Sequence, residues 1–245
     1  MVTVDDGVAD LERDRSRLGR SSTAERVADI LRDRISEGFF EPGQRLSEES
    51  ISEALGVSRN TLREAFRLLS HERLLYHRLN RGVFVRILSA EDVADLYRVR
   101  RVIEGAAVRR APTPMALRLI REAVADAERA AASDDWRAVG TANIRFHQAL
   151  VTLNQSPRLD EAMCQLLAEL RLVFHVMKNP RTFHEPFVER NRRLLELLES
   201  GRPDEAASFL DAYLDHAERL LVDAYEPAYE PNSSTPTSPA HGRNR

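Results

Sequence analysis

The chain has 245 residues, a formal net charge of −3, 42% hydrophobic residues and a single cysteine, Cys164. This length is enough for two compact cores, and one cysteine excludes an intramolecular disulfide framework or a cysteine-based zinc cluster. No segment offers the roughly 18 uncharged apolar residues of a membrane span, so we expect a cytoplasmic protein. A chain with this charge can contact nucleic acid only through a local basic patch.

Both ends of the sequence predict disordered tails. Residues 1–20 mix charges with few large apolar groups, and residues 226–245 are rich in proline, serine and asparagine, compositions that cannot bury a core. The segment between them predicts two domains, at 21–88 and 89–225.

The first domain is predicted to begin with a helix that Thr23 caps and Gly38 stops, on the strength of its apolar spacing. A Pro-Gly turn follows. A short second helix is then expected between a cap at Ser47 and Gly56.

A third helix begins at Ser58, directly after that glycine. Its apolar residues fall on one face: Leu62, Ala65, Phe66 and Leu69. Two helices joined by a tight glycine turn predict a helix-turn-helix. The β-prone runs 74–77 and 83–87 then flank a turn, which predicts a small hairpin, a wing.

The second domain predicts helices only. The first runs from Ala90 until Pro112 interrupts it, and the fifth follows "KNPRT" and ends at Gly201. The others are expected from Pro114 through Ala132, from a cap at Ser133 to about Leu153, from Pro157 to Met177, and from Pro203 through Tyr225. Six helices with short connections predict an antiparallel bundle of six to seven helices, in a mainly α-helical protein.

The outer face of the third helix predicts contact with DNA. Arginine can bond guanine bidentately, asparagine can do the same with adenine, and helix N-terminal amides suit phosphate. Residues 58–81 carry six arginines against two glutamates, a net charge of +4. The alternative is a charged face that is only solvated, but the glycine-turned helix before it and the arginine-tipped hairpin after it favour DNA binding.

The run "PGQRLSEESISEALGVSRNTLREAFRLLSHERLL…NRGVFV", with the helix before it, resembles the winged-helix DNA-binding domain of the GntR family of bacterial transcription regulators. The resemblance covers about 65 residues. It implies a DNA-binding role for eight residues: Arg45, Ser58, Arg59, Asn60, Thr61, Arg63, Arg81 and Gly82. Arg45 also has a structural use in its turn.

Two departures from the family pattern stand out. Asn60 and Thr61 replace a common Thr-Pro pair, so the operator sequence cannot be predicted from the contacts that the family usually makes. Arg73 stands where a glycine usually ends the helix, which predicts a different helix end.

Residues 90–225 resemble the FCD effector domain of the FadR-like subgroup. Many members hold a divalent metal with one Asp and three His, and the corresponding positions here are Asn143, His147, Asn191 and Tyr213. Only His147 keeps the family's residue type. Because two amides, a phenol and one imidazole are a poor metal-binding set, we expect no firmly bound cofactor and prefer direct hydrogen bonding of an organic effector.

Arg100 matches a family arginine that can face the pocket, where it would suit a carboxylate. The alternative is a surface arginine paired with Glu104 at i+4.

The sequence as a whole predicts a homodimeric, effector-responsive repressor that binds a double-stranded, pseudo-palindromic DNA operator and no membrane. Three alternatives remain at this stage. One is a metal-responsive regulator that uses His147, one is a bundle that only dimerises, and one is an enzyme built on the helical domain.

Overall fold

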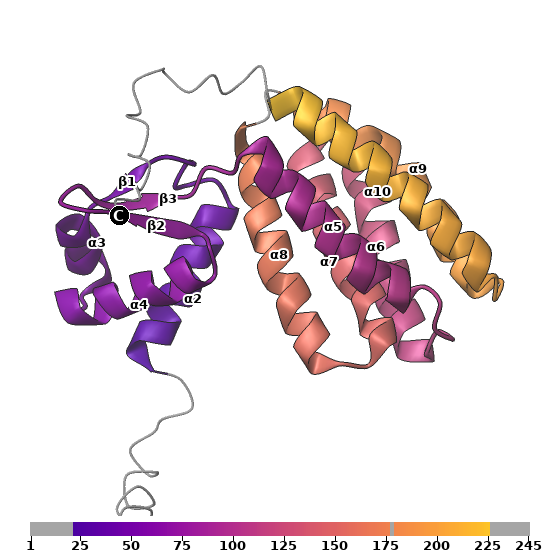
Figure 1. Cartoon of the computed structure of the whole chain (residues 1–245), viewed down its shortest axis with the longest axis horizontal. Coiled ribbons are helices and arrows are strands. Elements are labelled where there is room, and N and C mark those ends of the chain that lie inside the picture. The colour runs from indigo at the N-terminus through magenta and orange to yellow at the C-terminus, as the bar shows by residue number, and fades with distance from the viewer. Residues whose placement is uncertain (1–21, 177–178, 226–245) are drawn as a thin grey trace, which may run out of the picture. The chain divides into compact units, whose positions relative to one another are not determined.

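The computed structural model describes residues 22–176 and 179–225, so both predicted tails and Met177 lie outside the described residues. The chain divides into two compact units (Figure 1). The first comprises residues up to Leu88 together with Cys164–His175, and the second comprises Ser89–Met163 and the residues from Val176 onward. The predicted class, a winged helix-turn-helix followed by a helical bundle, is confirmed.

The first unit contains α2 (Thr23–Ser36), α3 (Glu48–Leu55) and α4 (Arg59–His71). Ser47 and Ser58 cap α3 and α4 as predicted, each accepting a hydrogen bond from the backbone three residues on. The cap of α2 was predicted wrongly: Ser22 fills it, not Thr23, because Ser22 and Glu25 form a reciprocal capping box. Gly56 ends α3 in the left-handed conformation, with φ of 63°.

A three-stranded antiparallel sheet completes this unit, in the order β1 (Arg45–Leu46), β3 (Gly82–Val85), β2 (Leu75–Arg78). The hairpin matches the predicted wing. The two-residue strand β1 was not predicted, and it pairs Arg45 with Phe84. Leu46, Leu75, Val83 and Val85 are buried, whereas the side chains between them are more exposed.

The core of the first unit fixes the rotation of α4. Leu62, Ala65, Phe66 and Leu69 are fully buried, and α2 is the helix that packs most extensively on α4. Arg32 of α2 donates two hydrogen bonds of 2.6 Å to the carboxylate of Glu72 just beyond α4. With the apolar stripe buried, the opposite face of α4 points to solvent.

The end of α4 contradicts the expectation of an altered helix stop. Arg73 adopts φ of 58°, the left-handed conformation that glycine usually supplies. The Leu74 amide donates to the Leu69 carbonyl at 2.9 Å and the Arg73 amide to the Ser70 carbonyl at 3.1 Å, the two bonds of a Schellman motif. The usual stop is therefore formed by a residue that is strained in it.

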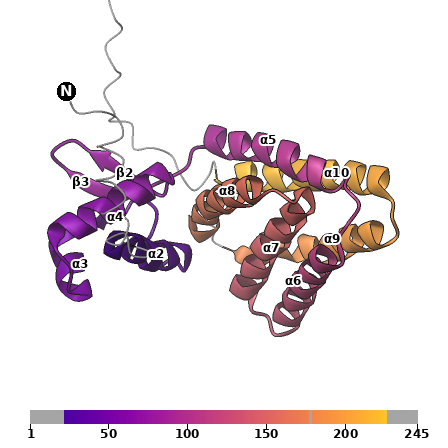
Figure 2. The same cartoon turned by 90° about the horizontal axis from the view of Figure 1, so that it is seen from below.

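The rest of the described chain forms the six predicted helices, which belong to the second unit except for residues 164–175. Their bounds are α5 (Ala90–Ala107), α6 (Pro114–Ala132), α7 (Trp136–Val151), α8 (Pro157–Val176), α9 (Pro180–Glu199) and α10 (Pro203–Tyr225), with a 3-10 turn at Thr152–Asn154. Helix α9 packs on α6, α7 and α10, and α10 packs on α5 (Figure 2). Asp135, not Ser133, caps α7, because Ser133 is already the C-cap of α6.

The last part of α8 belongs to the first unit. There Glu169 accepts a hydrogen bond from Arg86 at 3.2 Å, and the Arg171 side chain donates to the Ser36 carbonyl at 3.0 Å. The Glu169 carboxylate is nearly buried. Residues 164–175 therefore complete a unit whose other members precede residue 89.

We predict that Arg73→Gly raises the free energy of unfolding by about 1 kcal/mol, because glycine occupies the left-handed region without the strain of a side chain. The midpoint of urea unfolding measures this change. The matched control is Arg67→Gly in the interior of the same helix, which should lower stability by about 1 kcal/mol. A loss of stability in both variants would contradict the strain at Arg73.

Candidate functional site

The exposed face of α4 carries the predicted base-reading residues. Arg59, Asn60 and Arg63 are all exposed, since the buried stripe turns them outward. The Ser58 hydroxyl accepts the Thr61 amide at 3.1 Å and lies 2.8 Å from the Thr61 hydroxyl. These two hydroxyls therefore act locally in the helix cap.

The arginines of this face are not free cations. Arg59 donates to Glu49 and Arg63 donates to Glu48, each at 2.9 Å. Both glutamates lie in the first turn of α3. Arg67 pairs with Glu64 one turn away in its own helix. The charge count over residues 58–81 missed the first two pairs, because Glu48 and Glu49 precede that segment.

The tip of the wing holds Arg81 and Gly82. Gly82 has φ of 104°, and a Cβ atom built there would lie 3.1 Å from Nε of Arg45. The Arg45 side chain thus lies against Gly82, and a side chain at position 82 would crowd it. Arg45 lies in β1, which pairs with β3, whereas Arg81 lies in the turn between β2 and β3.

Arg78 is a further exposed arginine of the wing that the sequence reasoning did not single out. Its guanidinium lies 5.5 Å from the ring centre of Tyr76 and 5.4 Å from that of Phe84, and the two rings stack with centres 5.6 Å apart. Such cation–π contacts hold an exposed cation in place without neutralising it. The alternation of Tyr76 and Arg78 in a strand was the available signal, since residues two apart share a face.

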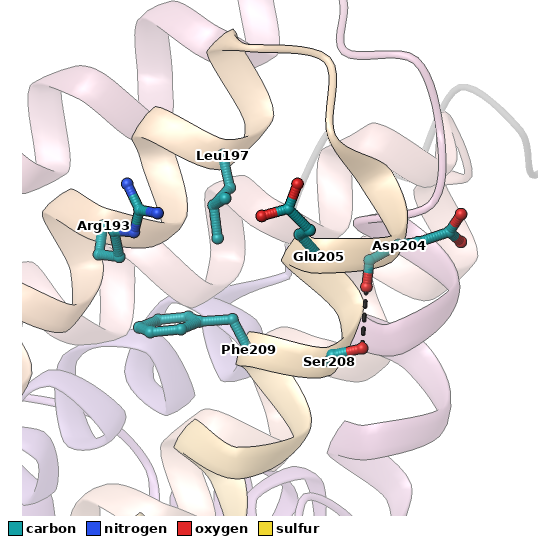
Figure 3. Close-up of a pocket in the computed structure, with 6 residues that line it drawn as sticks. All are labelled: Arg193, Leu197, Asp204, Glu205, Ser208 and Phe209. Carbon is teal, nitrogen blue, oxygen red and sulfur yellow. Dashed lines mark hydrogen bonds between the residues drawn. The ribbon is translucent and has the colours of Figure 1, made fainter.

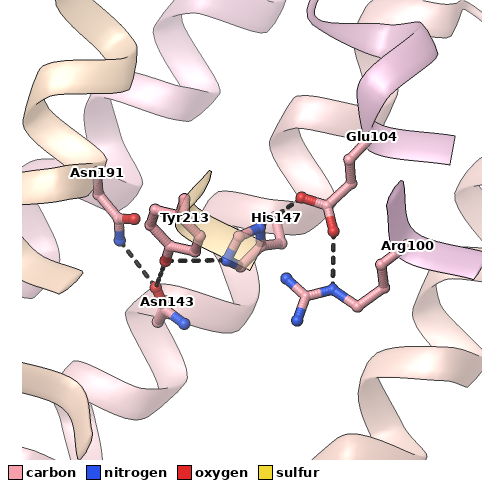
Figure 4. A network of polar contacts seen from close by, with 6 residues as sticks. All are labelled: Arg100, Glu104, Asn143, His147, Asn191 and Tyr213. Carbon is pink, nitrogen blue, oxygen red and sulfur yellow. Dashed lines mark hydrogen bonds and ion pairs between the residues drawn. The ribbon is translucent and has the colours of Figure 1, made fainter. Parts of the chain in front are cut away.

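The second unit contains a buried polar network (Figure 4). All four residues at the family's metal positions meet there. The Asn191 side-chain amide donates to Oδ1 of Asn143 at 2.8 Å, and the Tyr213 hydroxyl donates to the same oxygen at 3.1 Å. Nε2 of His147 lies 3.2 Å from the Tyr213 hydroxyl.

An ion pair extends this network into α5. Nδ1 of His147 lies 2.6 Å from one oxygen of Glu104, and Nε of Arg100 donates to the other at 2.8 Å. Arg100 and Glu104 are 2% and 0% exposed, so the surface pair considered from the sequence is wrong: the pair forms but is buried. The Arg100 guanidinium also lies 4.7 Å from the ring centre of Tyr97.

The charges of this network balance. Burial alone would raise the pKa of Glu104, but Arg100 and His147 outweigh that effect and hold this pKa below its usual value. Burial lowers the pKa of His147, and Glu104 offsets only part of the effect. Burial raises the pKa of Tyr97 to about 12 and that of Tyr213 well above its usual value. One cation and one anion therefore remain, with a neutral imidazole and two neutral phenols.

The hydrogens of the network do not match its acceptors. A neutral His147 that donates from Nδ1 to Glu104 has an acceptor at Nε2, which then competes with Asn143 for the single hydroxyl hydrogen of Tyr213. Two buried atoms of this network have no hydrogen-bond partner among the described residues: Nη2 of Arg100 and Oδ1 of Asn191. Figure 4 shows the end of the Arg100 side chain turned toward His147. The network thus keeps one charged donor and one acceptor unused.

These residues do not fit a divalent metal. His147 has both ring nitrogens engaged, the Asn143 oxygen already accepts two hydrogen bonds, and the Tyr213 phenol is neutral. Across residues 22–176 and 179–225, no three histidine, cysteine, aspartate or glutamate residues are grouped to hold a metal ion. The set lacks the anionic ligand and the imidazoles that a tightly held transition metal needs.

A separate groove lies on the outside of the bundle, between α9 and α10 (Figure 3). It is wide open to solvent and is lined by Arg193, Leu197, Asp204, Glu205, Ser208 and Phe209. The Ser208 hydroxyl donates to the Asp204 carbonyl at 3.0 Å. None of the predicted effector residues lines it.

The buried network predicts that the stability of the folded protein decreases as the pH is lowered. The folded state keeps His147 neutral, whereas the unfolded chain takes up a proton near the ordinary pKa of 6.5. The unfolded state therefore binds more protons below about pH 6.5, and stability falls by up to about 1.4 kcal/mol per pH unit. Glu104, whose folded pKa is held below 4.5, adds a further loss below that pH.

Melting temperatures of the wild type, His147→Gln and His77→Gln between about pH 8 and pH 5 measure this effect. His77 is exposed and serves as the control. His147→Gln should show the shallower dependence on pH, and His77→Gln should match the wild type. Equal slopes in all three proteins would contradict the buried, neutral state of His147.

Both units of the chain match known protein families. The family model described as bacterial regulatory proteins of the gntR family matches residues 23–85, and the FCD domain model matches residues 95–216. In the described residues, no helix is long and apolar enough to cross a membrane.

Individual relatives agree with these matches. A GntR transcriptional regulator from Rhodococcus sp. RHA1, known as a crystal structure, is 48% identical, covers 84% of this chain and 100% of its own, and has a TM-score of 0.79. The Nta operon transcriptional regulator of Aminobacter aminovorans is 28% identical over 80% of this chain and 95% of its own length. The gluconate operon transcriptional repressor of Bacillus licheniformis is 41% identical over 36% of this chain and 35% of its own.

These relatives are transcriptional regulators, which excludes the enzyme considered from the sequence. The matched segments coincide with the winged helix and with the bundle that holds the buried network. The chain therefore belongs to the GntR family of bacterial transcriptional regulators and combines a DNA-binding GntR domain with an FCD domain.

Proposed function

We propose that this DNA-binding regulator is a repressor that binds its operator as a homodimer and is controlled by a small organic effector. The observation that carries the DNA-reading part is the exposed face of α4, which four fully buried residues hold toward solvent. One recognition helix reads one half-site, so two copies suit a pseudo-palindromic operator. A similar protein is named a repressor, and a regulator of the chromosome acts in the cytoplasm.

The proposed DNA contacts divide by chemistry. Arg59, Asn60 and Arg63 read base edges in the major groove, where arginine matches guanine and asparagine matches adenine. Ser58 and Thr61 present the start of α4 to a phosphate. In the wing, Arg81 and Gly82 approach the minor groove, and Arg45 supports them from β1.

The proposed effector is a small carboxylate that binds at the buried network. Its site comprises Arg100, Asn143, His147, Asn191 and Tyr213. The support is the charged donor Nη2 of Arg100, which lacks a partner among the described residues and would pair with a carboxylate oxygen. A hydroxyl group on the ligand would suit the unused oxygen of Asn191. The ligand changes operator affinity if it prefers one arrangement of the DNA-binding units.

The assignment of the base-reading arginines predicts that Arg59→Ala/Arg63→Ala loses specific binding. Each good base contact contributes about 1–3 kcal/mol, so operator affinity should fall about 30-fold or more. Fluorescence anisotropy with a duplex selected from a random pool by the wild-type protein measures this loss.

The control for this variant is Arg98→Ala/Arg129→Ala, which removes the same charge from exposed positions of the second unit. It should bind the selected duplex like the wild type. Unchanged preference for that duplex in Arg59→Ala/Arg63→Ala would rule out these two arginines.

The effector assignment predicts that small carboxylates, but not the matching neutral amides, raise the melting temperature. A ligand at about 100 times its dissociation constant adds about 2.7 kcal/mol. Arg100→Lys keeps a cation beside Glu104 but has no second nitrogen for the ligand, so the rise should be lost. Thermal-shift measurements on a panel of mono-, di- and hydroxycarboxylates test this, with circular dichroism as the check on folding.

The same assay separates the alternatives. Zinc, nickel and manganese should leave the melting temperature unchanged, and a rise that disappears in His147→Ala would favour a metal-responsive regulator instead. No rise with any carboxylate would leave the bundle as a dimerisation module.

A further inference from the structure

The two carboxylates that face the recognition helix come from the start of α3. Glu48 and Glu49 are the first two residues after the cap at Ser47, and they reach Arg63 and Arg59 respectively. Both arginine side chains are 63% exposed, so the pairs lie on the surface that the proposed function presents to DNA.

An ordinary surface ion pair contributes about 0–1 kcal/mol to stability. The main consequence of these two ion pairs is therefore their effect on an approaching anion. The N-terminus of a helix attracts anions through its unpaired amides and its dipole. Here the chain places its own carboxylates at that end of α3. A DNA phosphate that approaches α3 or the two arginines meets negative charge already in place.

The negative charge of Glu48 and Glu49 opposes the approach of a base edge less than that of a phosphate. Guanine presents neutral acceptors, and each paired guanidinium still has donors to offer. Glu48 uses Nε of Arg63, which leaves both terminal nitrogens for a bidentate contact, and Glu49 uses only Nη2 of Arg59. The carboxylates therefore restrain the two side chains without using up their donors.

The wing arginines are arranged differently. Arg78 rests on the rings of Tyr76 and Phe84, and Arg45 lies against Gly82. In the described part of the chain, no carboxylate forms an ion pair with Arg45, Arg78 or Arg81. These cations carry their full charge to a phosphate, whereas Arg59 and Arg63 do not.

We propose that Glu48 and Glu49 are specificity-determining residues: they hold Arg59 and Arg63 for contact with bases and disfavour their contact with phosphates. Attraction to any DNA then comes mainly from the wing, and discrimination among sequences comes from α4. This inference rests on the proposed role of the two arginines in reading bases.

The test is the variant Glu48→Gln/Glu49→Gln, in which the side chains keep their size but lose their charge. Fluorescence anisotropy compares two duplexes at several salt concentrations, one selected from a random pool by the wild type and one of shuffled sequence. Affinity for the shuffled duplex should rise more than affinity for the selected one, so that their ratio falls about tenfold. The salt dependence of shuffled binding should steepen by up to about 1.8, because two arginines become available to phosphates.

The matched control is Glu41→Gln/Glu53→Gln, which removes the same charge from two exposed positions of the first unit and leaves the ion pairs of α4 in place. It should change both affinities alike and leave the ratio unchanged. The proposal is overturned if Glu48→Gln/Glu49→Gln behaves like this control while Arg59→Ala/Arg63→Ala loses the preference for the selected duplex. The two glutamates would then have no part in sequence discrimination. If the arginine variant also keeps the preference, the assignment of the reading residues itself has failed.

Discussion

A charge inside a helical bundle has to be neutralised where it lies, and this constraint organises the second unit. Arg100 is buried in α5, and its partner Glu104 lies one turn along the same helix. Removing either one would leave an uncompensated buried charge, at a cost of about 3–5 kcal/mol. Glu104 also orients His147, whose other ring nitrogen faces Tyr213, and Tyr213 and Asn191 both donate to Asn143. A salt bridge within one helix thereby fixes side chains from three others.

The first unit handles charge in the opposite way, at its surface. Its core decides only which side of α4 faces outward, and polar contacts decide how available each cation is. Stacked aromatic rings leave the charge of Arg78 intact, whereas a carboxylate screens Arg63. Two arginines with equal formal charge therefore present different potentials to a ligand. A count of charges along the sequence cannot show this difference.

Regular features were predictable from the sequence, because helix spacing, glycine stops and proline starts act locally. The meeting of Asn143, His147, Asn191 and Tyr213 followed from the family resemblance and not from spacing alone. The errors have physical reasons. Ser22 and Thr23 can both cap a helix, and only the reciprocal bond with Glu25 decides between them. The i+4 spacing of Arg100 and Glu104 is the same whether the pair is exposed or buried, so the sequence does not show which it is. The contact between Glu48 and Arg63 depends on how α3 packs against α4, which local spacing does not give.

The end of α8 changes what counts as the DNA-binding domain. A protein cut after Leu88 would keep every proposed DNA contact, yet it would lack the carboxylate that Arg86 meets and the guanidinium that caps the Ser36 carbonyl. It would also lose the apolar side chains of Leu167 and Leu170, which are buried in the intact chain. The boundary in the sequence and the boundary in the fold therefore differ. A chimera that joins this winged helix to another effector domain has to carry residues 164–175 with it.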